Sequence, residues 1–272
     1  YYCYILDEKK YFIKYIQQSL ADGNAFALKK AAQELYWICM KDSGKWYASV
    51  LEEQTKELTY GREAFYFVVC YLQNMFVQDS TFELDVQLKI YILILQMSKR
   101  LYQEQETEES YRDYCISCDK VGDIYQKQGD LEKALIQYEK SLFLRKKFDK
   151  KQKTPESCND YSISCNRMGD IYQEQGDLEK ALKYYKRSQI LRQNLYKKQK
   201  TKEHCRGYLV SCIKMGEIYQ KQGNLEEAFH MYQESQTFSR KLYQEQKTAK
   251  SCRDYSVSCD RMGNLYQEQG NL

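Results

Sequence analysis

The sequence is poor in residues that interrupt helices and in residues that most often do chemistry. It contains a single proline, Pro155, in 272 residues. Because proline breaks the interior of a helix, this scarcity, together with 29% charged residues, favours long helices exposed to water. Histidine occurs only as His204 and His230, at positions that do not recur. Catalysis is disfavoured, because a nucleophile, its base and an orienting group should occur as a set.

Long apolar stretches are also missing. The run from Ile90 to Leu95 is far shorter than the roughly 20 residues of a membrane helix, and Gln73 and Asn74 interrupt the run from 64 to 77. We therefore expect no membrane contact. The chain starts at Tyr1 and stops at Leu272 within a repeat, so we expect it to be part of a longer protein.

The excess of positive charge is small. A net charge of +4 and a pI of about 8.3 do not by themselves indicate a nucleic-acid partner. Lysines cluster at the expected ends of helices, and no aromatic stripe of the kind that binds single strands is interleaved with them. We interpret these clusters, of which the largest is Lys146, Lys147, Lys150, Lys151 and Lys153, as solvated helix ends.

Cysteine is plentiful, but its pattern does not indicate disulfides. The eleven cysteines are odd in number, no secretory signal is evident, and most recur at fixed positions. These features favour reduced, buried thiols in a cytoplasmic protein. Cys115 and Cys118 form only a lone pair, so no metal site is expected. No phosphate-binding glycine loop is present either, and we expect no cofactor and no enzymatic activity.

A repeat dominates the rest of the chain. The stretch that begins at Met168 and Gly169 has close copies, whose glycines, Gly122, Gly169, Gly216 and Gly263, are spaced by 47 residues. A fixed period of this size indicates a repeat architecture. We divide the regular array into residues 107–153, 154–200, 201–247 and a truncated copy, 248–272.

Each repeat is predicted to contain two helices. The first begins after a threonine that can cap it (Thr107, Thr154, Thr201 or Thr248) and ends before a glycine (Gly129, Gly176, Gly223 or Gly270). The second begins after Asp130, Asp177, Asn224 or Asn271 and runs for about 22 residues. Cys165, Met168, Gly169 and Tyr172 share one face of the first helix. Gly169 and Ala181 are the small pair expected to let the two helices approach closely.

The N-terminal part is less regular. Residues 62–106 are interpreted as a degenerate repeat, because Leu101 to Gln105 match Leu242 to Gln246 three periods later. This segment includes a long helix expected at 82–105, preceded by one at about 62–78. Residues 1–61, with helices expected near 7–20, 25–40 and 46–58, are interpreted as an irregular helical cap or a separate module.

These motifs resemble the tetratricopeptide repeat (TPR) family. Its pattern of large, small and aromatic positions is matched in one repeat by Cys165, Met168, Gly169, Tyr172, Gly176, Ala181, Tyr185 and Ser188. The same offsets recur from Cys118 and Cys212, and a cut copy starts at Cys259. The period of 47 exceeds the usual 34, which resembles the longer TPRs of kinesin light chain and of bacterial multi-repeat proteins. The resemblance implies an all-α, right-handed superhelical solenoid of antiparallel helix pairs, with an irregular N-terminal helical region.

The resemblance also implies a concave groove lined by the first helices. A basic residue stands at one groove position of every repeat, and three residues later stands an acidic or amide residue: Lys120 with Asp123, Arg167 with Asp170, Lys214 with Glu217 and Arg261 with Asn264. Asp119, Asn166, Ile213 and Asp260 flank them, and Gln126, Gln173, Gln220 and Gln267 continue the face. One hypothesis is a polar ladder that binds an extended peptide or acidic tail. The other is that these charges pair within a repeat or with the neighbouring repeat.

Three functions remain open. The first is a scaffold or sensor that binds a protein or peptide partner in the groove. The second is a regulatory arm of a larger enzyme or transcription regulator whose effector domain lies outside this sequence. The third is self-assembly into a homo-oligomer, through the N-terminal region or the open C-terminal end. The family's carboxylate-clamp pattern is not met at Asp119, Asn166 and Asp260, which argues against binding of chaperone tails.

Overall fold

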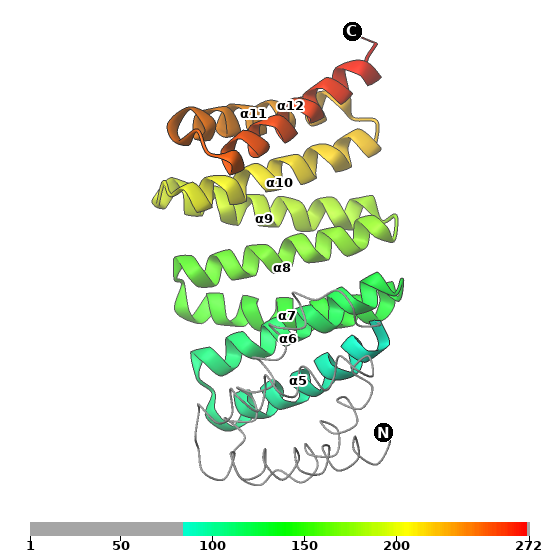
Figure 1. The fold of residues 1–272 in the computed structure, drawn as a ribbon, viewed down its shortest axis with the longest axis vertical. Coiled ribbons are helices and arrows are strands. Elements are labelled where there is room, and N and C mark those ends of the chain that lie inside the picture. The colour runs from blue at the N-terminus through cyan, green and yellow to red at the C-terminus, as the bar shows by residue number, and fades with distance from the viewer. Residues whose placement is uncertain (1–83, 271–272) are drawn as a thin grey trace, which may run out of the picture. The chain divides into compact units, whose positions relative to one another are not determined.

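The computed structural model describes residues 84–270. The cap predicted at 1–61 and the helix predicted at 62–78 lie outside the described residues. Every described element is a helix (Figure 1). The helices are α5 (Leu84–Gln105), α6 (Glu108–Lys127), α7 (Leu131–Gln152), α8 (Pro155–Glu174), α9 (Leu178–Lys198), α10 (Lys202–Lys221), α11 (Leu225–Gln246) and α12 (Ala249–Glu268). The expectation of two helices per repeat is confirmed, and α5 occupies the segment predicted as the long helix.

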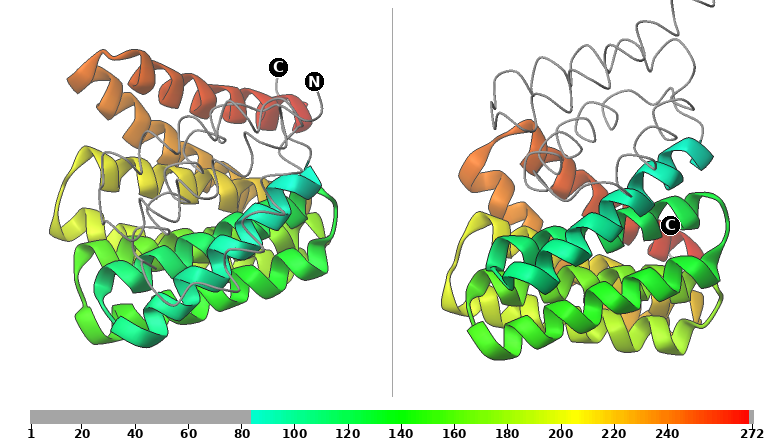
Figure 2. Two further views of the ribbon diagram at one scale, coloured as in Figure 1. Left: turned by 60° about the horizontal axis from the view of Figure 1, so that its bottom comes forward. Right: turned by 90° about the horizontal axis from the view of Figure 1, so that it is seen from below.

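The chain divides into two compact units, residues 1–130 and 131–272. In the described part of the N-terminal unit, α5 packs against α6, and Gln128 donates to Asp85 across the pair at 2.7 Å. In the C-terminal unit, each helix from α7 to α12 packs against the next (Figures 1 and 2). The fold is an all-α solenoid of helix pairs packed side by side, as the sequence predicted.

Local sequence sets the ends of these helices. The threonines Thr107, Thr154, Thr201 and Thr248 all accept a hydrogen bond from the amide three residues later. This bond satisfies one of the free N–H groups of the first turn. Asp177 and Asn224 cap α9 and α11 in the same way. After the first helices, Gly129, Gly176, Gly223 and Gly270 have φ between +68° and +80°, the left-handed region that glycine tolerates best.

The core joins successive repeats. Ala181 and Tyr185 of α9 cluster with Met215 and Ile218 of α10. The corresponding set, one period of 47 residues later, joins α11 to α12 through Ala228, Tyr232, Met262 and Leu265. The second helix of one repeat therefore packs on the first helix of the next, and neither repeat buries this apolar surface alone.

The close approach predicted at Gly169 occurs, but its nearest neighbour is the ring of Tyr185. A methyl group added at Gly169 would lie 2.6 Å from Tyr185 Cδ1, and the same holds at 2.7 Å for Gly216 and Tyr232 Cδ1. Gly263 occupies the corresponding position in α12, and an added methyl would meet nothing within 4 Å. The glycine therefore makes room for a tyrosine ring that is fully buried in two repeats.

Small buried serines connect the helices elsewhere. Ser188 donates to the backbone carbonyl of Ser162 at 3.0 Å and lies 3.4 Å from Ser211, and Ser235 lies 3.1 Å from Ser258. These contacts satisfy polar groups that burial would otherwise leave costly. The eight described cysteines are all free thiols, and five of them are buried.

Candidate partner-binding surface

Charged side chains on successive first helices pair with one another. Lys214 of α10 lies 2.8 Å from Asp170 of α8, and Arg261 of α12 lies 2.7 Å from Glu217 of α10. In both cases the basic residue of one repeat meets the acidic residue of the repeat before it. Of the two sequence hypotheses for these charges, pairing with the neighbouring repeat describes both bridges. Lys214 and Asp170 remain one-third exposed, so the pair lies at the surface.

Two buried tyrosines form hydrogen bonds with this layer of polar side chains on the first helices. The Tyr185 hydroxyl donates to Asp170 at 2.5 Å and to the Gln173 side-chain carbonyl at 3.1 Å. The Tyr232 hydroxyl donates to the Gln220 carbonyl at 2.9 Å. Burial, followed by the negative charge of Glu217, raises the pKa of Tyr232 to about 12, so this hydroxyl stays protonated and remains a donor.

A polar hollow opens among three first helices. It has a volume of about 500 Å³ and is lined by Gln173 of α8, by Glu217, Gln220 and Lys221 of α10, and by Arg261 and Glu268 of α12. Gln220 also donates to Glu268, which connects α10 to α12. We call the side chains of this hollow, together with the Asp170–Lys214 pair, the first-helix surface. It presents amide, carboxylate and cationic groups within one small area.

The remaining predicted residues are distributed differently. Arg167 is half-buried, and its guanidinium lies over the ring of Tyr138, 5.5 Å from the centroid. Asn264 is exposed on α12. Lys120 and Asp123 are half-buried on α6, in the N-terminal unit.

Most residues of the column that flanks the basic residues are more buried than the sequence indicates. Asp119, Asn166 and Ile213 were placed on the exposed face, yet they are only 5%, 9% and 9% exposed. Asp260 is the exposed member of the column. The helix pattern did not reveal this burial, because periodicity within one helix does not show which of its residues are covered in the folded chain.

Sequence reasoning missed four participants. Tyr185 matches the TPR-like pattern and Tyr232 is its equivalent in the next repeat, but the pattern does not show that their hydroxyl groups reach the polar layer. Lys221 and Glu268 line the hollow and were not singled out. A signal for the last two existed, since their column alternates in sign from repeat to repeat as Lys127, Glu174, Lys221 and Glu268.

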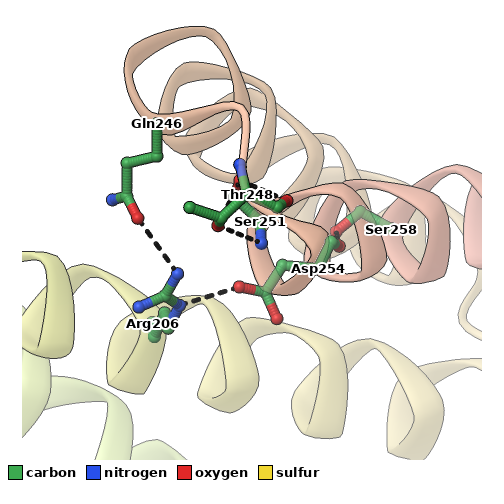
Figure 3. A network of polar contacts seen from close by, with 6 residues as sticks. All are labelled: Arg206, Gln246, Thr248, Ser251, Asp254 and Ser258. Carbon is green, nitrogen blue, oxygen red and sulfur yellow. Dashed lines mark hydrogen bonds and ion pairs between the residues drawn. The ribbon is translucent and has the colours of Figure 1, made fainter.

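A second contact between first helices lies near their N-terminal ends (Figure 3). Arg206 of α10 donates to Asp254 of α12 at 2.9 Å and to Gln246 at 3.3 Å. Asp254 lies one turn after the capping box formed by Thr248 and Ser251. Both charged side chains are about one-fifth exposed, so this pair reinforces the step between repeats and offers little surface to a partner.

Within residues 84–270, no group of three or more histidine, cysteine, aspartate or glutamate side chains could hold a metal ion. None of the helices in this range combines the length and the apolar character that a membrane crossing requires.

Comparison with known proteins agrees with this geometry. Two family models described as tetratricopeptide repeat match the chain, one over residues 117–148 and 163–193 and the other over residues 209–246. No curated protein matches significantly. A crystal structure from Podosopora anserina, described as a kinesin light chain with nearly identical TPR-like repeats, shares the fold with a TM-score of 0.51 and 14% identity. The match covers 88% of this chain and 97% of that one.

The Q17M form of the same Podosopora anserina protein gives a TM-score of 0.53 at 13% identity, over 88% of this chain and 96% of that one. At these identities the likeness establishes the fold alone. The expected similarity to long kinesin-light-chain-like repeats is confirmed at that level.

Proposed function

We propose that this chain, which is a tetratricopeptide repeat protein, binds an extended peptide segment of a protein partner along its first-helix surface. Its repeats support a general role as a scaffold for protein–protein interaction, and such repeats are typically not enzymatic. The proposal adds the position of the binding surface and the kind of segment that it takes.

The polar hollow shared by α8, α10 and α12 supports the proposal most directly. Its side chains come from three successive repeats, so a ligand that lies along it contacts the same positions repeatedly. Gln173 and Gln220 stand at the same place in consecutive repeats, and a glutamine amide can both donate to and accept from a peptide backbone. Because tyrosines orient these amides from below, their conformational freedom is already restricted before binding.

The cations that were expected to bind a partner are already paired in the folded chain. Lys214 and Arg261 are each bound to a carboxylate of the preceding repeat. An acidic residue of a partner would have to compete for these cations, and exposed pairs of this kind are worth only about 0.2–1 kcal/mol. The pairs are therefore weak enough to open, and they keep the lysine and arginine in place until a partner carboxylate arrives.

The test is peptide selection on the whole chain, with a random peptide library displayed on phage. The double variant Lys221→Glu with Arg261→Glu reverses both cations that line the hollow. We expect the selected peptides to bind it at least about tenfold more weakly, a loss of about 1.4 kcal/mol. Isothermal titration with the synthetic peptides gives the dissociation constants.

The matched control is Lys197→Glu with Arg240→Glu, which makes the same change of charge at exposed positions of α9 and α11. It should bind the peptides as the unmodified chain does, and circular dichroism should show equal helicity in both variants. Equal affinity of the two double variants for every selected peptide would refute the proposed surface.

A further inference from the structure

A second hollow lies on the other helices of the array, between α7 and α9 with α8 at its floor. Its volume is about 760 Å³. We propose that it binds a short acidic peptide segment carrying apolar side chains, at a site separate from the first-helix surface. Its lining includes Leu142 and Lys146 of α7, Tyr161 and Cys165 of α8, and Arg187 and Ile190 of α9.

The next repeat packs the corresponding helices differently. Between α9 and α11, one period later, the ring of Phe238 packs edge-on against Tyr208 and Tyr196, with ring centroids 5.3 and 5.4 Å apart. At the position corresponding to Phe238, the earlier repeat has Leu191, and at that of Tyr196 it has Asp149. The ring contacts of Phe238 with Tyr208 and Tyr196 in the later repeat therefore have no counterpart beside Tyr161.

Polar contacts that close the later space are also replaced. There, the Tyr208 hydroxyl donates to Glu234, and Gln193 donates to that hydroxyl. The corresponding residues around Tyr161 are Arg187 and Lys146. Arg187 instead lies against the face of the Tyr161 ring, 5.8 Å from its centroid. The change from acid and amide to two cations replaces an acidic partner of the tyrosine with a basic one and leaves positive charge at the rim.

The floor of the hollow is apolar. Tyr161 and Cys165 are buried, Leu142 and Leu182 are half-buried, and Ile190 is 51% exposed at the edge. Burial raises the pKa of the Cys165 thiol to about 12, so the sulfur is neutral and adds no charge to the floor. An apolar floor with a few polar groups at the edge is the usual composition of a ligand site, and the volume is in the usual range of about 300–1,000 Å³.

The rim determines which ligand fits. Lys146, Lys183, Lys186 and Arg187 supply four cations, against the single carboxylate of Glu179. In the next repeat the four corresponding residues are Gln193, His230, Gln233 and Glu234, so this charge belongs to one site and not to the repeat pattern. All four cationic side chains are exposed. Charge complementarity therefore selects carboxylates around an apolar anchor, and the exposed rim accommodates a chain segment that enters and leaves the hollow.

The test uses a fluorescently labelled peptide of alternating glutamate and leucine, with fluorescence anisotropy as the readout on the whole chain. Lys183→Glu with Arg187→Glu reverses two rim cations and should weaken binding at least about tenfold. Ile190→Ser removes apolar surface at the edge and should also weaken binding. Added salt should weaken binding to the unmodified chain, because exposed charges are screened.

Two controls separate this site from general attraction to a basic helix. Lys197→Glu with Lys198→Glu makes the same change of charge in the last turn of α9 and should leave the affinity unchanged. A peptide with glutamine in place of glutamate should bind at least about tenfold more weakly. Equal weakening by both double variants, or equal binding of the neutral peptide, would overturn the proposal. So would displacement of the labelled peptide by a first-helix-surface peptide, since that places both ligands at one site.

Discussion

Tyrosine at one position of the second helix connects the core with the surface. Tyr185 and Tyr232 are fully buried, yet each hydroxyl emerges beneath the polar layer of the first helices. Burial and the charge of Asp170 raise the pKa of Tyr185, which keeps its proton available for the hydrogen bond to Asp170. The ring fits only because the facing position of the first helix is glycine.

Replacing that glycine tests the fit. We expect Gly169→Ala to lower the free energy of unfolding by about 1–3 kcal/mol, because the new methyl group overlaps the Tyr185 ring and a packed core cannot absorb it. Gly263→Ala is the matched control at the same repeat position, where the space is open. It should be neutral or stabilise by up to about 1 kcal/mol, as alanine favours a helix. Urea unfolding of both variants distinguishes the two outcomes; equal effects would contradict the role given to the tyrosine ring.

At the scale of helices, the steps between successive first helices are built in two ways. Between α10 and α12, Arg206 pairs with Asp254 (Figure 3). Between α8 and α10 the corresponding residues are Asn159 and Gly207. There Arg192 of α9 donates to the Ser162 hydroxyl at 3.0 Å and to the Gly207 carbonyl at 2.7 Å. Burial lowers the pKa of Arg192 to about 10, yet the group remains a cation near neutral pH.

Two of the second helices, α7 and α11, are followed by a lysine with a strained backbone conformation. Lys247 ends α11 in the left-handed region, with φ of +47°, and Lys153 has φ of +54° at the same repeat position. Lysine is disfavoured there and glycine is not, so we expect Lys247→Gly to raise the free energy of unfolding by about 0.5–1 kcal/mol.

Lys200 occupies the corresponding position after α9, and it is not among the residues with positive φ. Lys200→Gly should therefore give no gain, because glycine only adds freedom to the unfolded chain. Thermal unfolding of the two variants checks the prediction, and a similar increase in both would show that backbone geometry is not the cause.

At the scale of the molecule, the C-terminal unit behaves as a row of similar interfaces. Leu265 of α12 is completely buried against Ala228 and Tyr232 of α11. In an array that is stabilised between neighbours, damage to one interface remains local. Distant interfaces should retain their stability.

We expect Leu265→Ala to cost about 2–5 kcal/mol at this interface. Hydrogen exchange followed by mass spectrometry should then show faster exchange in α11 and α12, with α8 and α9 unchanged. Gln267→Ala, at an exposed position of the same helix, serves as the control and should change little. Faster exchange throughout the C-terminal unit would mean that the unit unfolds cooperatively instead.

The repeat made much of the fold predictable. Thr154, Gly176 and Asp177 act on the backbone of their immediate neighbours. Their roles in capping helices and forming the turn could therefore be predicted from the local sequence. The candidate surface was less predictable. Lys214 was recognised as a surface residue, but its partner Asp170 lies in the preceding repeat, at a distance that helical periodicity does not encode.

The sequence by itself determined the period, the helix ends and the residues shared by every repeat, because these depend on local hydrogen bonding and on which side chains can be buried. Only the tertiary structure decided how neighbouring repeats differ. Leu191 and Phe238 occupy the same repeat position, and the ring of Phe238 packs across the space between two second helices. In the earlier repeat, a hollow opens beside Tyr161. That outcome depends on volumes contributed by three helices at once, which no single stretch of sequence contains.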